Sequence, residues 1–402
     1  MSIFSKDKLE KYANVLVWGF QTSRHGGEIK PYETALLVYD IAAQDLADAM
    51  HKRLLEMKIN VMLRPVMRPV MEKNLYTLAD EKMLGFMNPG EKEMFSNLNI
   101  YIRLRAPECL THLKDVDPKR MGIAALARKP MRNIMDKREQ EGKFSWTLCT
   151  YPTEELAKQA KLSLKEYAAQ VEKACFLGEK DPVAKWRQIY EECTEIKKWI
   201  TSLGIETIRL QSKRCDLEVK MGEKRKFLGV SGHNVPSFEV FTSPDWRGTR
   251  GIYFADFPSF RDGNYVKDIK LVFEKGKAVK ISAGTGETYV KKTLAMDAGA
   301  SALGEFSLTD RRFSKIDRFM ADTLFDENHG GKYGNSHVAV GSSYSDTFAG
   351  DPKTLNKAKK AALGFNNSAL HWDIINTEDK LVTAVLKNGK KVTVYETGEF
   401  KY

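Results

Sequence analysis

The chain has 402 residues, which is more than one hydrophobic core usually supports, so we expect two domains. Hydrophobic residues make up 42% and charged residues 29%, which indicates a soluble, globular chain and not a disordered one. The net charge of +11 suggests nucleic acid as a partner, but the basic excess is spread over both halves and forms no basic tail. We therefore expect no nucleic-acid partner.

The N-terminus and the cysteines favour a cytoplasmic protein. Acidic and basic residues precede any apolar run, which is not typical of a secretory signal. No segment approaches the ~20 apolar residues that span a bilayer, so no membrane partner is expected. The five cysteines are odd in number and lack CxxC spacing, which argues against a disulfide framework and a Cys-based zinc site.

Residues 1–210 alternate strand-like and helix-like segments. The apolar run at 14–20 predicts a buried strand, and residues 35–57 show the periodicity of a helix. Three further strand candidates are rich in β-branched and aromatic residues and lie at 59–64, 99–104 and 144–149. This alternation indicates βαβ units and a largely parallel sheet, that is, an N-terminal α/β domain.

Helices are expected between and after these strands. One lies near residues 120–140, and another follows Thr153, which suits a helix N-cap. A long helix begins at Pro182 and stops before Gly204. We place the domain boundary just beyond this helix, between residues 210 and 211.

Residues 211–402 differ, because strand candidates follow one another with only turns between them. They lie at 216–220, 238–241, 251–255, 269–273 and 278–281. Asn388-Gly389 predicts a type I′ turn in a hairpin near the C-terminus. Two helical pieces are also expected, near 312–324 and 353–363. This half is expected to be an α+β domain rich in antiparallel strands.

Acidic and imidazole side chains stand beside apolar, β-rich residues at five places in this second half. A lone charge would be costly to bury there, and a divalent cation removes the cost because it pairs with several carboxylates. The five segments are 236–244, 304–305, 326–328, 337–344 and 371–373.

His371 and Asp373 form the sharpest of these motifs. Strand residues two apart point to one face, so the imidazole and the carboxylate would converge while Trp372 turns away. Asp373 is then either a metal ligand or the group that orients His371. The alternative is a hydrogen-bonded His–Asp pair in a core.

Glu239 and Glu305 raise a related question. Glu239 has apolar neighbours on both faces of its strand, so it should be buried beside a partner, either a cation or an arginine. Gly304 lets a backbone or ligand approach Glu305 closely. Taken alone, Asp326-Glu327 is typical of a solvated acidic loop.

Together these side chains predict a metal site. Six of them offer the oxygen and nitrogen ligands that suit Zn²⁺, Co²⁺ or Mn²⁺, namely Glu239, Glu305, Glu327, His337, His371 and Asp373. Six ligands exceed the needs of one tetrahedral ion and suit two ions ~3.5–4 Å apart with a bridging carboxylate and a bridging water. Tyr344 is placed to donate a hydrogen bond to an oxyanion, the alternative being a packed aromatic.

These segments resemble the metallo-aminopeptidase family typified by aminopeptidase T, aminopeptidase S and the thermophilic aminopeptidase II. Order and spacing agree in the segments 232–245, 302–305, 323–328, 337–344 and 371–373. The resemblance implies removal of N-terminal residues from peptides, two divalent metal ions and a homodimer.

The resemblance also implies a role for each residue. The six side chains fall on the family's metal-ligand positions, with Glu305 as the bridging carboxylate, and Tyr344 falls on its active-site tyrosine. The segment between Glu327 and His337 is longer than in most members, which makes His329 a competitor. We favour His337, because Val-Ala-Val-Gly-Ser-Ser-Tyr follows it.

The sequence therefore predicts a metal-dependent aminopeptidase that acts on peptides with a free N-terminus through a water activated by two metals. Glu305 is also a candidate general base. One alternative is another dinuclear metallohydrolase, an amidase or a phosphoesterase, with the same ligands. A nucleic-acid-binding protein is a further alternative, but it leaves the six-ligand pattern unexplained.

Overall fold

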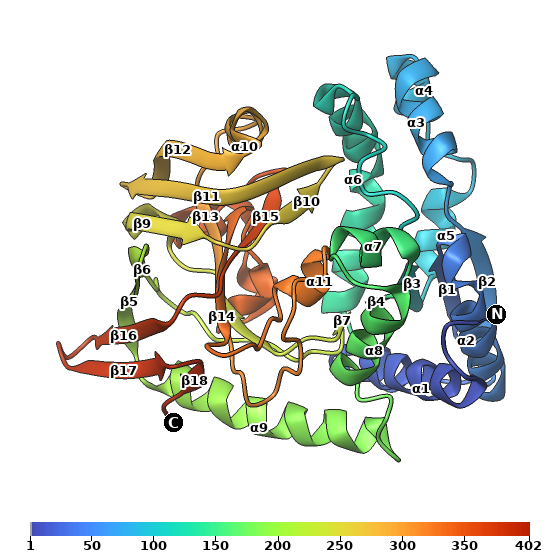
Figure 1. Cartoon of the computed structure of the whole chain (residues 1–402), viewed down its shortest axis with the longest axis horizontal. Helices are drawn as coiled ribbons and strands as arrows, with labels where there is room; N and C mark the ends of the chain where they lie inside the picture. Colours follow the sequence, from blue (N-terminus) through green and yellow to red (C-terminus); the bar gives the residue numbers. More distant parts are fainter. Residues whose placement is uncertain (1) are drawn as a thin grey trace. The chain divides into compact units, whose positions relative to one another are not determined.

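The computed structural model describes residues 2–402, which form two compact units (Figure 1). The first unit takes the chain up to Trp186 and two short returning segments, Ser231–Pro236 and Arg261–Asn264. The second unit takes the three remaining segments, Arg187–Val230, Ser237–Phe260 and Tyr265–Tyr402. The domain boundary that we place between residues 210 and 211 stays a prediction.

A five-stranded sheet forms the middle of the first unit. Its strands are, in spatial order, β2 (Asn60–Pro65), β1 (Thr34–Tyr39), β3 (Ile100–Arg105), β4 (Ser145–Thr150) and β7 (Asn234–Val235). All of their pairings are parallel; Ala35, for example, lies opposite both Val61 and Ile100. The parallel sheet predicted for this half is confirmed.

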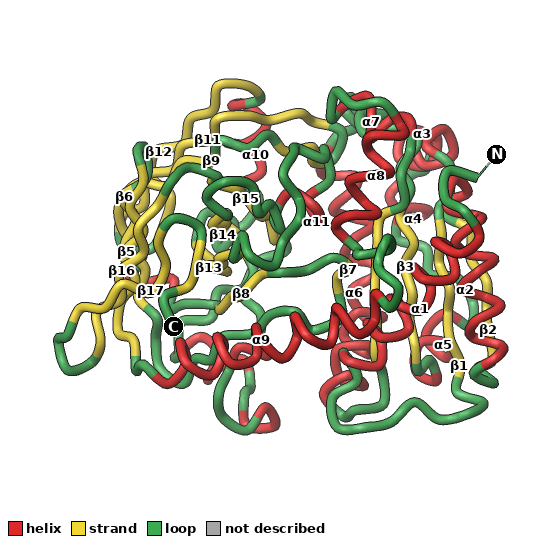
Figure 2. The backbone as a smooth tube through the Cα atoms, turned by 60° about the horizontal axis from the view of Figure 1, so that its bottom comes forward, coloured by secondary structure: helices red, strands yellow, loops and turns green. Residues whose placement is uncertain are grey.

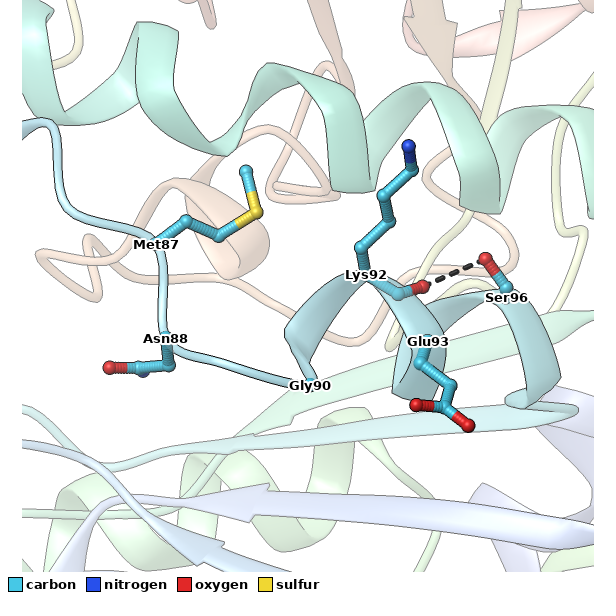
Figure 3. A pocket seen from close by; sticks show the side chains of 6 residues that line it. All are labelled: Met87, Asn88, Gly90, Lys92, Glu93 and Ser96. Atoms are coloured by element: carbon cyan, nitrogen blue, oxygen red, sulfur yellow. Dashed lines mark hydrogen bonds between the residues drawn. The ribbon is translucent and has the colours of Figure 1, made fainter.

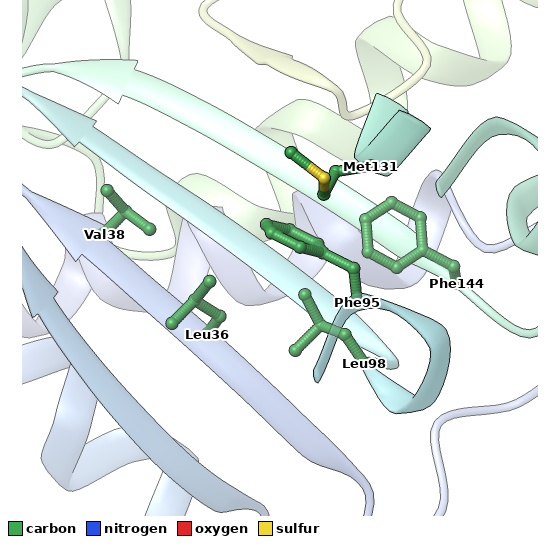
Figure 4. Packing of buried hydrophobic residues seen from close by; sticks show 6 residues of the cluster. All are labelled: Leu36, Val38, Phe95, Leu98, Met131 and Phe144. Atoms are coloured by element: carbon green, nitrogen blue, oxygen red, sulfur yellow. The ribbon is translucent and has the colours of Figure 1, made fainter. Parts of the chain in front are cut away.

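The helices of this unit connect its strands, and several of them run alongside the sheet (Figure 2). They are α1 (Lys6–Thr22), α2 (Gln44–Glu56), α3 (Pro69–Leu78), α4 (Glu81–Leu84), α5 (Glu91–Asn97), α6 (Pro118–Gln140), α7 (Glu154–Gln159) and α8 (Leu164–Ala174), with a 3₁₀ turn at Ile41–Ala43. Leu36 and Val38 of β1 pack against Phe95 of α5 and Met131 of α6 (Figure 4). Burying side chains of this kind stabilises the fold by about 1.5–3 kcal/mol each.

Two predictions for the start of the chain are wrong. Residues 14–20 belong to α1 and not to a strand, and residues 35–57 divide into β1 and α2. In α1 the side chains from Val15 to Phe20 are all buried, so this helix lacks a polar side in that stretch. A short apolar run of this kind does not distinguish a buried helix from a buried strand.

The later elements of this half agree with the sequence. Strands β2, β3 and β4 each begin one residue after the predicted position. Thr153 caps α7, because its side-chain oxygen accepts a hydrogen bond of 3.2 Å from the backbone N of Leu156. Helix α9 (Pro182–Ser202) has the predicted start and is followed by Gly204 with a φ of 62°. It begins in the first unit and continues in the second.

The larger sheet of the second unit has nine strands. They are β5 (Ile205–Ser212), β6 (Asp216–Lys220), β9 (Arg250–Ala255), β10 (Ser259–Arg261), β11 (Asn264–Glu274), β12 (Lys277–Thr285), β16 (Lys380–Leu386), β17 (Lys391–Glu396) and β18 (Glu399–Phe400). Neighbours such as β5 and β6, β11 and β12, and β16 and β17 are antiparallel, as predicted. The hairpin at Asn388-Gly389 is present, but only Gly389 has a positive φ, so its turn is not type I′.

A smaller antiparallel sheet of four strands carries the acidic and imidazole residues. Its order is β15 (His371–Asn376), β14 (Asn335–Gly341), β13 (Leu303–Thr309) and β8 (Glu239–Thr242). One of its faces is apolar and fully buried, and is formed by Val240, Phe306, Leu308, Val338, Val340, Trp372 and Ile374. Polar groups on the other face therefore stand on a rigid, tightly packed support.

The helices of this unit are short. They are α10 (Glu287–Leu294), α11 (Thr323–Asp326) and α12 (Lys357–Ala362), with 3₁₀ turns at Trp246–Gly248, Ser345–Thr347 and Pro352–Thr354. The helix predicted near 353–363 is thus present, whereas only the last residues of the one predicted near 312–324 are helical. Within residues 2–402, no helix combines the length and the apolar character needed to cross a membrane.

Candidate metal centre

The register of the four-stranded sheet brings the predicted residues onto one face. Glu305 of β13 lies opposite Ala339 of β14, which in turn lies opposite Asp373 of β15. Residues directly opposite each other point to the same side of a sheet, as do residues two apart in one strand. His337 and His371 therefore share this face with Glu305 and Asp373.

Small residues on the central strand leave room for the longer side chains beside them. Ala339 separates Glu305 from Asp373, and Gly341 lies opposite His371. Gly341 has a φ of 106°, and a Cβ atom there would collide with the carbonyl oxygen of Leu370. The acids and imidazoles of the neighbouring strands can therefore meet above β14.

Glu239, Glu305 and His337 form the first group of possible ligands. Their ligand atoms all lie within 4.8 Å of one another. His337 Nε2 is 3.1 Å from Glu305 Oε1 and 3.4 Å from Glu239 Oε2. Within residues 2–402, the ion-pair partners of both glutamates are imidazoles, so the arginine partner considered for Glu239 does not apply.

Glu305, His371 and Asp373 form the second group, again with ligand atoms within 4.8 Å of one another. His371 Nε2 is 3.4 Å from Asp373 Oδ1 and 3.7 Å from Glu305 Oε2. His371 Nδ1 lies 2.9 Å from the carbonyl oxygen of Ser342, to which it donates, and this turns Nε2 toward the acids. Trp372 points to the opposite, apolar face, as the alternation predicts.

Burial and mutual charge shift the pKa values of this group. Burial raises the pKa of Glu305 to about 7, and the negative charge of Glu239 adds to the shift while the hydrogen bond from His337 opposes it. Burial lowers the pKa of His371, but Asp373 and Glu305 outweigh it and bring that pKa to about 9. Burial likewise lowers the pKa of His337, but the hydrogen bonds with Glu239 and Glu305 outweigh burial and hold that pKa well above its usual value.

Glu327 lies next to this face but in neither group. It follows α11, is 7% exposed, and its backbone carbonyl accepts hydrogen bonds from Thr309 and Asn335. Burial raises its pKa well above the usual value, and the negative charges of Glu239 and Asp373 add to the shift. Its carboxyl group is therefore close enough to the others to interact with their charges.

His329, the competitor of His337, lies elsewhere. Its ring packs edge-on against Phe257, with ring centres 4.8 Å apart, and it has no atom in either ligand group of the described chain. Burial lowers the pKa of His329 to about 4. The geometry thus places His337, and not His329, among the carboxylates.

Tyr344 stands at the edge of the site. Its backbone N donates a 2.8 Å hydrogen bond to Ser243 Oγ, and its ring centre lies 4.7 Å from that of His371 and 5.8 Å from that of Phe241. The residue is 45% exposed, so its phenol is not simply a packed core aromatic.

Asn328 contributes to the site in a way that the sequence did not indicate. Its Oδ1 accepts a 2.6 Å hydrogen bond from the backbone N of Phe238, and its Nδ2 donates to the carbonyl of Leu324 at 2.9 Å. This side chain therefore fixes the start of β8 beside Glu239. Neither periodicity nor composition signals such a link between two distant loops.

A hollow of about 510 Å³ lies in the first unit beside α5 (Figure 3). Its lining includes the side chains of Lys92, Glu93 and Asn88, and Ser96 Oγ donates a 2.7 Å hydrogen bond to the carbonyl of Lys92. The lining holds one carboxylate and no imidazole, so it offers no second set of metal ligands.

The donor set on the four-stranded sheet fits divalent cations. It combines carboxylate oxygens and imidazole nitrogens, which suit zinc, cobalt and manganese, and it contains no thiolate. Its members are buried or half-buried, and the acids outnumber the imidazoles. Buried negative charge of this kind is stable only when it is paired or coordinates a metal.

Proteins similar to this chain are known over nearly its whole length. The thermophilic metalloprotease (M29) family matches residues 5–400. Aminopeptidase PepS of Streptococcus thermophilus is 25% identical over an alignment of 420 positions, which covers 98% of each chain. Aminopeptidase T of Thermus aquaticus is 28% identical over 306 residues, which cover 72% of this chain and 73% of that protein. The solved structure of wild-type AmpT from Thermus thermophilus covers 99% of this chain and 100% of its own, with a TM-score of 0.81 and 21% identity, a likeness of fold.

Proposed function

Because the chain belongs to the thermophilic metalloprotease (M29) family, and is therefore a metal-dependent peptidase, we propose that it removes N-terminal residues from peptides with the help of two divalent ions. The observation that carries the proposal is the position of Glu305. Its Oε1 faces His337 and its Oε2 faces His371, so one carboxylate belongs to both ligand groups. A carboxylate shared in this way is what two adjacent ions require.

In this proposal six residues would hold the ions, and Glu305 would be the carboxylate common to both. The other five are Glu239, Glu327, His337, His371 and Asp373, and the ions are zinc, cobalt or manganese. When bound, such ions lower the pKa of a water molecule toward neutrality and polarise the scissile carbonyl group.

The chain's own side chains perform the remaining tasks. The Tyr344 hydroxyl donates a hydrogen bond to the oxyanion as the tetrahedral intermediate forms. Glu305 also stays our candidate for the general base. In that role one of its two oxygens would have to leave an ion, take a proton from the attacking water and pass it to the leaving amine. A carboxylate of the site pairs with the α-ammonium group of the substrate, which restricts cleavage to chain ends.

The test is Glu305→Gln, which keeps the size of the side chain and removes its charge. The variant is expected to cleave an aminoacyl anilide at least 100-fold more slowly than wild type, because both the shared ligand and the proton acceptor are lost. Glu274→Gln, at an exposed position of the second unit, is the matched control and should retain full activity. A folded Glu305→Gln protein with wild-type activity would remove the basis of the proposal.

Two parallel assays separate the aminopeptidase from its alternatives. An N-acetylated aminoacyl anilide should not be cleaved, because its ammonium group is blocked. A nitrophenyl phosphate should also remain intact. Cleavage of the acetylated substrate would indicate an amidase, and cleavage of the phosphate ester a phosphoesterase.

The homodimer and the cytoplasmic location also stay proposals. The homodimer is supported by the resemblance of the motifs, and the cytoplasmic location by the five cysteines, which are all free of disulfides. Light scattering coupled to size-exclusion chromatography measures the first, and cell fractionation the second.

A further inference from the structure

His337 differs from His371 in the surroundings of its second ring nitrogen, Nδ1. Among the described residues, Nδ1 of this buried side chain has no hydrogen-bond partner, although Nε2 faces Glu305 and Glu239. A histidine that uses Nε2 as a ligand carries its proton on Nδ1, and that N–H group is normally held by an acceptor. The equivalent nitrogen of His371 meets the carbonyl oxygen of Ser342. His337 therefore lacks the Nδ1 hydrogen bond that His371 makes.

A second unpaired group lies directly across the sheet. Ser307 of β13 is the register partner of His337 on β14, so both side chains stand on the same face. Ser307 is fully buried, and its Oγ also lacks a hydrogen-bond partner within the described chain. Directly opposite residues have Cβ atoms about 4.5–5.5 Å apart, and a serine hydroxyl can turn between three staggered positions.

We propose that Ser307 is a positioning residue for the metal centre: its hydroxyl oxygen accepts the Nδ1–H of His337, directly or through one water molecule. This inference rests on the proposed function, since it assumes that His337 Nε2 is a ligand. The hydrogen bond fixes which nitrogen carries the proton and prevents the ring from turning away from Glu305. It also pairs two buried polar groups whose burial would otherwise be unfavourable.

The experiment compares Ser307→Ala with Ser336→Ala. Ser336 is a matched control, because its hydroxyl is also buried and without a partner among the described residues, yet it belongs to the opposite face of β14. Zinc affinity is measured by competition with a chromophoric chelator, independently of activity. Ser307→Ala is expected to bind zinc 10- to 100-fold more weakly than wild type, and Ser336→Ala as tightly as wild type.

A spectroscopic signature separates positioning from a general loss of stability. In the zinc-loaded protein, ¹⁵N-histidine NMR should show a hydrogen-bonded imidazole N–H that Ser307→Ala loses or shifts and Ser336→Ala keeps. If the alanine variant does not fold, Ser307→Cys, which is similar in size but a weaker acceptor, should give an intermediate affinity.

The outcomes distinguish the two proposals. If wild type binds no divalent ion, the proposed function fails. If wild type binds zinc and both alanine variants bind it equally well, with the imidazole N–H unchanged, only the role of Ser307 is refuted.

Discussion

Glu305 lies between two imidazoles, with one carboxylate oxygen facing each. Among the described residues, Glu239 by contrast lies at ion-pair distance from one imidazole, that of His337, and accepts a hydrogen bond from Ser237 Oγ. At the scale of single residues, the role of a carboxylate in this site depends on the number of imidazoles that lie beside it. The sequence identified both glutamates, and the resemblance implied that Glu305 is the shared one. The strand register adds the geometry, in which one oxygen of Glu305 lies toward each imidazole.

Tyr344→Phe tests the proposed oxyanion contact. The substitution removes the hydroxyl and keeps the ring packed against His371 and Phe241. We expect kcat to fall by roughly 10²–10³, the usual cost of losing one oxyanion donor, with little change in KM. Steady-state kinetics on an aminoacyl anilide, with metal content as the control, provides the measurement. An unchanged kcat at full metal content would assign Tyr344 to packing only.

Lys380 is a buried cation outside the site. It is 3% exposed, and its Nζ donates to the carbonyl of Tyr333 at 3.3 Å. Burial lowers its pKa to about 8 from an ordinary value of 10.5, against the raising effect of Asp256. Between those two pH values the unfolded chain holds more protons than the folded one, so this group makes stability rise with pH in that window.

Replacing Lys380 with methionine should remove this contribution. Wild type is expected to gain up to about 3 kcal/mol from this group between pH 8 and pH 10.5, whereas Lys380→Met does not. Urea unfolding at several pH values measures the free energy of unfolding of both proteins. In the difference between the two values, the contributions of the other titrating groups cancel. A difference that stays constant across the window would contradict the lowered pKa.

At the scale of elements, the close approach of β13 to the end of β14 depends on Gly304. A Cβ atom at this position would collide with the carbonyl oxygens of Gly341 and Ser342. Gly304→Ala is therefore expected to cost about 1–3 kcal/mol of stability and to disturb His371, which is hydrogen-bonded to Ser342.

Gly122→Ala is the control for this substitution. Gly122 lies inside α6, where an added Cβ meets no atom within 4 Å, so alanine should stabilise the helix by roughly 0.5–1 kcal/mol. Urea unfolding and zinc content are compared for both variants. A Gly304→Ala protein as stable and as rich in zinc as wild type would show that the strands can separate without cost.

The elements that the sequence predicted correctly are those with distinct local signals. Thr153 caps α7 through its side chain, and Pro182 is the first residue of α9. Both are local signals of a helix start. The stretch 14–20 carried no such signal, because α1 is buried on all sides there. Its apolar and β-branched residues favour a strand locally, and packing in the first unit overrides that preference.

The candidate site could be predicted as a set of residues but not as an arrangement. His371 and Asp373 were expected on one face because alternation in a strand is a local rule. The neighbours of that pair across the sheet follow from register, which the sequence does not encode locally. Groups such as Asn328 and the Ser342 carbonyl were missed because they act from loops through tertiary contacts.

At the scale of the whole molecule, removal of divalent ions should lower the melting temperature. A ligand that binds only the folded state stabilises it by about 2.7 kcal/mol at a concentration of 100 times its Kd. For a folding unit of this size, that corresponds to roughly 5–10 °C. Scanning calorimetry before and after treatment with a chelator provides the measurement.

Readdition of zinc is the control for that experiment and should restore the original melting temperature. Magnesium should restore less, because it prefers an all-oxygen octahedral site to one with imidazoles. A protein that loses its metal, by elemental analysis, without any change in melting temperature would indicate that the acids of the sheet are stable without a cation.

Ala339, directly between Glu305 and Asp373, contributes no reactive group. Its methyl side chain nevertheless decides how near the flanking strands can bring their charges to one another. A leucine there would fill that space while leaving every acid and every imidazole in the chain. The chemistry of this sheet therefore depends on a small side chain at position 339 as much as on the acids and imidazoles. A related chain that keeps all of these acids and imidazoles but carries a large residue there would be inactive.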